Sequence, residues 1–175
     1  FKGGLHDPFG RLGTWNNSTD CCTWKGIKCD NGTHRVIRLD LRNPRGYNPA
    51  SALRNLADED FSLFYATGVL PSEINDGVLS PLFELQMLKY LDLSYNALIG
   101  VGVPRELHSL KNLQYLNLSN AGFVGEIPRE LGNMSRLQQL DLSTDYYFSS
   151  SSISLRIEDI RMWNLRDLEE LLLDG

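Results

Sequence analysis

The chain has 175 residues, of which 42% are apolar, so it is long enough and apolar enough to bury a core. Its formal charge of -5 gives no basic stripe of the kind that a nucleic-acid backbone requires, so we expect no nucleic-acid partner. No apolar run reaches the roughly 18 residues that a membrane-spanning helix needs, so we expect membrane attachment only through a span outside this sequence. Leucine is the unusual feature, because thirty leucines recur at short, fixed spacings.

Residues 1–35 lack the leucine spacing and contain all three cysteines. We predict that they form an N-terminal cap over the first coil of a repeat array. Its apolar contacts are expected from Phe1, Leu5, Leu12, Trp15 and Trp24.

The cysteines Cys21, Cys22 and Cys29 lie within nine residues of one another. A zinc site is disfavoured, because only His34 lies near enough to complete a set of four ligands. Vicinal cysteines pair with each other only under strain, so one of the first two bridges to Cys29 and the other is left over. We predict the pair Cys22–Cys29, with Cys21 joined to a cysteine outside this sequence, most simply one upstream of Phe1.

Five asparagines stand two residues before Ser or Thr with no proline between, as N-glycosylation requires. One or two such triplets arise by chance in a chain of this length. Five of them together with a predicted disulfide favour an extracytoplasmic compartment. The five are Asn16, Asn17, Asn31, Asn117 and Asn133.

Residues 36–41 have the alternating pattern of a first strand, and the leucine period is then lost over residues 42–77. We predict an irregular insertion there, which is either a structural detour or a binding element. Within it, residues 50–66 have the pattern of a short amphipathic helix.

From residue 82 onward the pattern L-x-x-L-x-x-L-x-L recurs, with a period of 24 or 25 residues. This pattern predicts leucine-rich repeats, in which each coil contributes one short strand and buries its leucines only by stacking on its neighbours. Pro104 and Pro128 recur at matching places and exclude a series of amphipathic helices. The repeats are expected near residues 82–109, 110–133, 134–164 and 165–175.

After each strand, the repeat has an asparagine whose side chain can bond the backbone of the neighbouring coil. Asn96 holds this position in the first unit, whereas Ala121 and Asp145 replace it in the next two. The third unit is enlarged by the aromatic and Ser-rich segment 146–152, which we interpret as a solvated loop or a ligand-contacting loop.

The residues between the core leucines are predicted to lie on a concave face, where aromatic side chains among polar ones suit protein binding. A glycan on Asn117 would occupy part of this face. No phosphate-binding glycine loop, nucleophile elbow or histidine pair is present in the sequence, so we predict no enzyme activity, no cofactor and no metal site. The predicted ligand face comprises Lys89, Tyr90, Asp92, Tyr95, Gln114, Tyr115, Asn117, Gln138, Gln139, Asp141, Glu169 and Glu170.

Two motifs of the sequence point to a known family. Residues 1–8 read F-K-G-G-L-H-D-P, and residues 20–29 read D-C-C-T-W-K-G-I-K-C. Residues 123–128 read F-V-G-E-I-P. The first two segments resemble the N-terminal cap of plant leucine-rich-repeat receptors, and the third is similar to the L-x-G-x-I-P element of the plant-specific repeat. The resemblance implies an α/β solenoid, a right-handed leucine-rich-repeat superhelix with a parallel concave β-sheet. It also implies a short 3-10 or irregular convex side and a helical, disulfide-bonded cap. In that cap the first of the two adjacent cysteines, here Cys21, forms a disulfide with a cysteine upstream in the chain.

The amino-acid sequences of the repeats are most similar to those of receptor-like proteins of the fungal-xylanase-receptor type. The resemblance implies a protein of the plant cell surface that senses a protein, peptide or glycan-associated ligand in immunity and signals through a co-receptor kinase. Two alternatives share this style of ectodomain, namely a secreted apoplastic inhibitor of pathogen wall-degrading enzymes and a developmental receptor kinase. Since the sequence starts at Phe1 without methionine and stops within a strand-like pattern, we expect it to be part of a longer protein.

Overall fold

The computed structural model describes residues 12–43, 76–96, 98, 102–144, 155–156 and 164–173. Most of the predicted insertion, including its helix at 50–66, lies outside these residues, as does the segment 146–152. Within the described ranges, no helix combines the length and the apolar composition needed to cross a bilayer.

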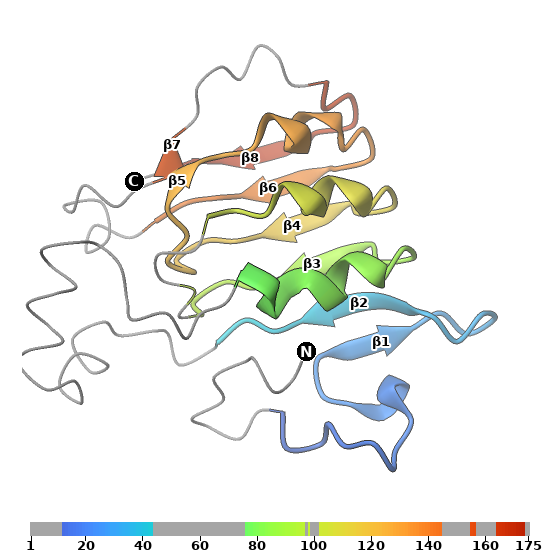
Figure 1. Cartoon of the computed structure of the whole chain (residues 1–175). Helices are drawn as coiled ribbons and strands as arrows, with labels where there is room; N and C mark the ends of the chain where they lie inside the picture. Colours follow the sequence, from blue (N-terminus) through green and yellow to red (C-terminus); the bar gives the residue numbers. More distant parts are fainter. Residues whose placement is uncertain are drawn as a thin grey trace, which may run out of the picture.

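The main sheet has six strands in the order β1-β2-β3-β4-β6-β8. The pair β1–β2 is an antiparallel hairpin, and every later neighbour is parallel. Each coil therefore adds one short strand to the growing edge (Figure 1), which is the arrangement of a leucine-rich-repeat solenoid. The strands are β1 (Ile27–Cys29), β2 (Val36–Asp40), β3 (Tyr90–Asp92), β4 (Tyr115–Asn117), β6 (Gln139–Asp141) and β8 (Glu170–Leu172).

One leucine from each parallel strand lies in register with the next. Because alternate residues of a strand point to opposite faces, this register places every one of these leucines on the same side of the sheet. The first four are at most 1% exposed, and the last is half-buried. Each fully buried leucine contributes about 1.5 to 3 kcal/mol relative to an exposed one. The aligned residues are Leu39, Leu91, Leu116, Leu140 and Leu171.

Short 3-10 segments close the coils on the other side of the leucine core. Pro104 and Pro128 precede two of them, where a residue without an N–H and with a fixed φ starts a helical turn readily. Leu107 and Leu131 point from these turns into the core and are 1% and 0% exposed. The segments are η3 (Asp76–Glu84), η4 (Arg105–Ser109) and η5 (Arg129–Asn133), beside a small parallel sheet of β5 (Gly125–Glu126) and β7 (Leu155–Arg156). A further 3-10 segment, η2 (Cys21–Thr23), belongs to the cap and precedes β1.

Asn96 joins two coils through its side-chain amide. Its Nδ2 donates to the carbonyl of Leu41 in the preceding coil at 2.9 Å and to that of Leu93 in its own coil at 2.8 Å. The predicted bond from this asparagine to neighbouring backbone is confirmed. Ala121 has no side chain that could repeat it in the next coil.

The cap residues pack around two tryptophans. Trp15 and Trp24 stack with ring centroids 5.2 Å apart, and the indole N–H of Trp15 donates to the Lys25 carbonyl at 3.0 Å. Gly26 then turns with φ +84° and accepts a hydrogen bond from the Asp40 N–H at 2.7 Å. A Cβ on Gly26 would overlap the carbonyl oxygen of Asp40, so the start of β1 can approach the end of β2 this closely only because this residue is glycine.

Gly26→Ala is expected to destabilise the protein more than Gly125→Ala. Both glycines have φ +84°, a conformation that costs an alanine about 1 to 3 kcal/mol. Only Gly26 adds a backbone clash, worth roughly a further 1 to 3 kcal/mol, because a Cβ on Gly125 meets nothing within 4 Å. Urea unfolding of both variants measures the difference, and equal losses of stability would contradict this account.

Candidate functional site

The face of the main sheet opposite the leucine core, here called the open face, carries two columns of polar and aromatic residues. They flank the aligned leucines on each strand, so strand pairing brings them side by side. We call the first the tyrosine column: Arg38, Tyr90, Tyr115, Gln139 and Glu170. The second, the carboxylate column, is Asp40, Asp92, Asn117 and Asp141.

Three members of the tyrosine column form a continuous stack. The rings of Tyr90 and Tyr115 are nearly parallel, at 4°, with centroids 4.1 Å apart. The guanidinium carbon of Arg38 lies 3.5 Å from the centroid of the Tyr90 ring. Aromatic stacking and a cation over a ring each contribute roughly 0.5 to 1.5 kcal/mol, so this surface is held in one arrangement before any ligand arrives.

Arg38 is a member of the open face that the sequence pattern did not predict. A signal for it was present, because Arg38-Leu39-Asp40-Leu41 follows the same pattern as Tyr90-Leu91-Asp92-Leu93. Residues 42–77, which lie between the two segments and lack the leucine period, made this match hard to recognise. Pairing of β2 with β3 places Arg38 directly beside Tyr90.

Burial raises the pKa of the Tyr90 hydroxyl above its usual range, with further contributions from a hydrogen bond with Tyr115 and from the charge of Asp92. The hydroxyl donates to the Asp92 carboxylate at 3.1 Å. Tyr90 therefore stays neutral at physiological pH and offers a packing surface without an added negative charge.

Asp92 lies on the predicted face but is not available to a ligand, which corrects our expectation for this residue. It is 1% exposed. One carboxylate oxygen accepts from the backbone N–H and the hydroxyl of Ser94 at 3.0 and 2.6 Å, and the other accepts from Tyr90. The same two hydrogen bonds, from the backbone N–H and the hydroxyl of a serine two residues later, recur in the next two coils. There Ser119 donates to Asn117, and Ser143 donates to Asp141.

Asn117 is the neutral member between two carboxylates. Its Nδ2 donates to the Asp141 carboxylate at 3.1 Å and to the Tyr115 hydroxyl at 3.2 Å, so both amide hydrogens are used. A glycan on this nitrogen would replace one of them, and the geometry therefore disfavours glycosylation at Asn117. The other predicted acceptors, Asn16, Asn17, Asn31 and Asn133, are all exposed.

The remaining predicted residues form an edge column beside the tyrosine column. Backbone bonds align it, since Gln114 N–H donates to the Lys89 carbonyl at 2.8 Å and Glu169 N–H donates to the Gln138 carbonyl at 2.7 Å. Tyr95 lies apart at the bend after β3, 38% exposed, with φ +57°, which is uncommon for a bulky residue. We define the edge column as Lys89, Gln114, Gln138 and Glu169; Lys89, Gln114 and Glu169 are exposed.

Comparison with known families agrees with this geometry. A family model described as leucine rich repeat N-terminal domain matches residues 1–30, and a leucine rich repeat model matches residues 87–110 and 112–134. The chain belongs to the leucine-rich-repeat family. The predicted fold is confirmed at this level, while the right-handed superhelix and the helical cap stay predictions.

Among leucine-rich-repeat proteins, the relatives are plant receptors, as the resemblance implied. The chain is 42% identical over 128 residues to receptor-like protein EIX2 of Solanum lycopersicum and 40% identical over 131 residues to receptor-like protein EIX1. Each match covers 73% of this chain and 11% of the relative, so the chain spans about a tenth of their length. The BIR2 ectodomain from Arabidopsis thaliana superposes with a TM-score of 0.65 at 26% identity, covering 98% of this chain and 74% of that one.

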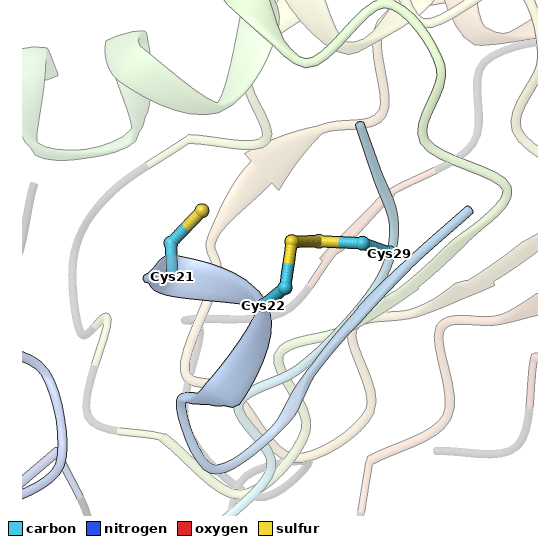
Figure 2. A group of neighbouring side chains, drawn as sticks. All are labelled: Cys21, Cys22 and Cys29. Atoms are coloured by element: carbon cyan, nitrogen blue, oxygen red, sulfur yellow. A yellow bond between two sulfur atoms is a disulfide. The ribbon is translucent and has the colours of Figure 1, made fainter. Parts of the chain in front are cut away.

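The three cysteines of this leucine-rich-repeat protein gather beside the cap hairpin (Figure 2). Cys22 and Cys29 form a disulfide with their Cα atoms 5.5 Å apart, which confirms the predicted pair. Cys21 is free and half-buried, and its Sγ lies within 4.8 Å of the other two sulfurs. Because two of the three sulfurs are bonded to each other, the cluster does not offer the thiolates that a metal ion would need.

Asn117→Asp should destabilise the protein at neutral pH by about 1 to 3 kcal/mol, because it places a third carboxylate beside Asp141 and Asp92 and removes the amide donor. The like charges raise the pKa of the new carboxyl in the folded state. The loss of stability should therefore shrink as the pH falls toward and below about 4. Chemical unfolding at pH 7 and pH 4 measures both effects.

Asn133→Asp is the matched control, because it also removes a sequon but changes an exposed residue. It should leave the free energy of unfolding unchanged within about 0.5 kcal/mol. If both variants lost a similar amount of stability, the hydrogen bonds of Asn117 in the carboxylate column would not be the cause of the loss in Asn117→Asp.

Proposed function

We propose that this chain is the N-terminal part of the ligand-recognition region of a plant cell-surface receptor-like protein. It binds a microbial protein, peptide or glycan-associated ligand and signals in immunity through a partner receptor kinase. The observation that carries the proposal is the Arg38–Tyr90–Tyr115 stack on the open face. The likeness to two tomato receptor-like proteins over 73% of the chain supports the receptor class.

The stack has the properties of a binding anchor. Tyrosine and arginine dominate the binding energy of many protein interfaces, because they combine a large contact area with polar groups. Here the two rings already pack on each other, and Tyr90 is held by its hydrogen bond to Asp92. A pre-ordered surface loses less conformational entropy on binding than a mobile one.

The disulfide and the positions of the sequons support an extracellular setting. The Cys22–Cys29 bridge is stable in an oxidising compartment. Four of the five candidate glycosylation sites are exposed in the cap, in the β1–β2 turn and at the end of η5. Glycans there would leave the open face free, whereas Asn117, which lies on that face, has its amide engaged.

Sequencing the transcript downstream of Gly175 separates this function from its rivals. A single apolar span followed by a short tail is the expected result and identifies a receptor-like protein. A kinase domain after the span would make the protein a receptor kinase. A repeat array that ends without any span would favour the secreted inhibitor and contradict the proposal.

A functional test compares plants that carry or lack the gene. Leaves with the full-length protein should answer fractionated microbial culture filtrates with a calcium or oxidative burst, and knockout leaves should not. Re-expression of the wild-type protein should restore the response. If knockout leaves answer every fraction as strongly as wild-type leaves, the proposed immune role is wrong.

Tyr90→Ala combined with Tyr115→Ala should weaken binding of the active fraction's ligand by roughly thirtyfold or more, the size of an interface hot spot. The control replaces two exposed arginines of the 3-10 segments, Arg105→Ala with Arg129→Ala, and should bind like wild type. Surface plasmon resonance gives the affinities, and circular dichroism shows whether each variant is folded. Unchanged affinity in a folded tyrosine double variant would exclude the stack as the binding site.

A further inference from the structure

The turn between β1 and β2 contains the only Asn-Gly pair of the sequence, Asn31-Gly32. Both residues are exposed. Backbone bonds close the turn, since the N–H of Asp30 donates to the Arg35 carbonyl at 2.9 Å and the N–H of His34 donates to the Asp30 carbonyl at 2.9 Å. Within the part of the chain that the structure describes, the side-chain amide of Asn31 makes no hydrogen bond. This amide is therefore free to rotate toward the backbone that follows it.

An asparagine followed by glycine can lose its amide without any enzyme, because glycine has no Cβ to obstruct its own nitrogen. The Gly32 nitrogen forms a bond to Cγ of Asn31 and loses its proton, and Nδ2 of Asn31 leaves as ammonia. Water then opens the five-membered imide at either of its two carbonyls. The products are aspartate and isoaspartate, so the net change exchanges water for ammonia and needs no oxidant or reductant.

The hydrogen bonds around Asp30 leave the Gly32 nitrogen available for this reaction. One oxygen of the Asp30 carboxylate accepts from the backbone N–H and the hydroxyl of Thr33, both at 2.8 Å, and from the Gly32 N–H at 3.2 Å. The bond to Gly32 is the longest of the three, so it holds the nitrogen least firmly. The carboxylate also lies where it can accept the proton that the nitrogen loses.

The same asparagine begins the sequon Asn31-Gly32-Thr33, and a glycan would be attached to the nitrogen that leaves as ammonia. We propose that Asn31 is a modification site with two exclusive outcomes. A glycan on Nδ2 preserves the asparagine, because the sugar hinders ring closure, and a molecule without the glycan deamidates at Asn31. This inference goes beyond the proposed function, since it concerns the chemistry of the cap and not the ligand.

Deamidation would alter the hairpin that covers the first coil. Aspartate adds a negative charge next to Asp30, and isoaspartate also lengthens the main chain by one carbon within the turn. The closing bonds between Asp30 and the residues 34 and 35 cannot all keep their geometry around a longer backbone. The change falls two residues from Cys29, whose disulfide ties the hairpin to η2.

The test follows the full-length protein, purified from leaves, during a long incubation at neutral pH. Trypsin cuts after Lys28 and Arg35, and Asn31 is the only residue with a side-chain amide in the peptide 29–35. A glycan-removing amidase, used in heavy-oxygen water, labels each asparagine that carried a glycan, so mass spectrometry distinguishes it from one that deamidated earlier.

The heavy-labelled fraction should stay constant while the remaining fraction converts from asparagine to aspartate and isoaspartate. Three results would each overturn the inference. They are the absence of any heavy label at Asn31, loss of the labelled fraction at the same rate as the rest, and survival of asparagine in the fraction without a glycan.

Variants separate the glycan from the ring closure. Thr33→Val removes the sequon, so every molecule should deamidate at Asn31. Adding Gly32→Ala to this variant should slow the reaction at least about tenfold, because a Cβ on the attacking residue raises the activation barrier. The turn accommodates alanine, since a Cβ there meets only the Asp30 carboxylate at 3.6 Å. Equal rates with and without Gly32→Ala would overturn the proposed reaction.

Asn133 is the internal control, because it is an exposed asparagine in a sequon but is followed by Met134. Molecules without a glycan at Asn133 should keep this asparagine throughout the incubation. If Asn133 deamidates as fast as Asn31, the Asn-Gly turn is not the cause and the inference is wrong. Responses to microbial fractions test the receptor function separately, since the modified turn lies outside the open face.

Discussion

The alignment of one leucine per coil governs the rest of this structure. Leu39, Leu91, Leu116 and Leu140 lie in register and are at most 1% exposed, so each strand is held at one height relative to its neighbours. A shift by one residue would turn every leucine outward, which makes the register strongly specified. The positions on either side of each leucine are fixed by the same constraint.

The open face is a direct consequence of that register. Residues before the leucines meet as the Arg38–Tyr90–Tyr115 stack, and residues after them meet as a row of hydrogen-bonded carboxylates and one amide. The tyrosine column and the edge column offer accessible side chains, whereas the carboxylate column mainly braces the ends of the strands through serine. Recognition and stability are thus divided between neighbouring columns of one sheet.

The cap depends on local geometry more than on the repeat. Gly26 adopts a positive φ against the backbone of Asp40, and the Cys22–Cys29 bridge ties η2 to β1 in the same hairpin. Two stacked tryptophans complete the contacts. The antiparallel β1 covers the edge of β2, which a parallel solenoid would otherwise leave unpaired.

The repeat, its strands and the cysteine pair could be predicted from the sequence, because they depend on spacings within about 25 residues of chain. The sequence also placed Tyr90 and Tyr115 on one face. The folded structure was needed to show that Arg38 stacks on Tyr90, that Asp92 is buried, and that the Asn117 amide is engaged. Those facts depend on contacts between coils that are far apart in sequence, and on which polar groups find hydrogen-bond partners once the strands are stacked, and neither is encoded in a local pattern.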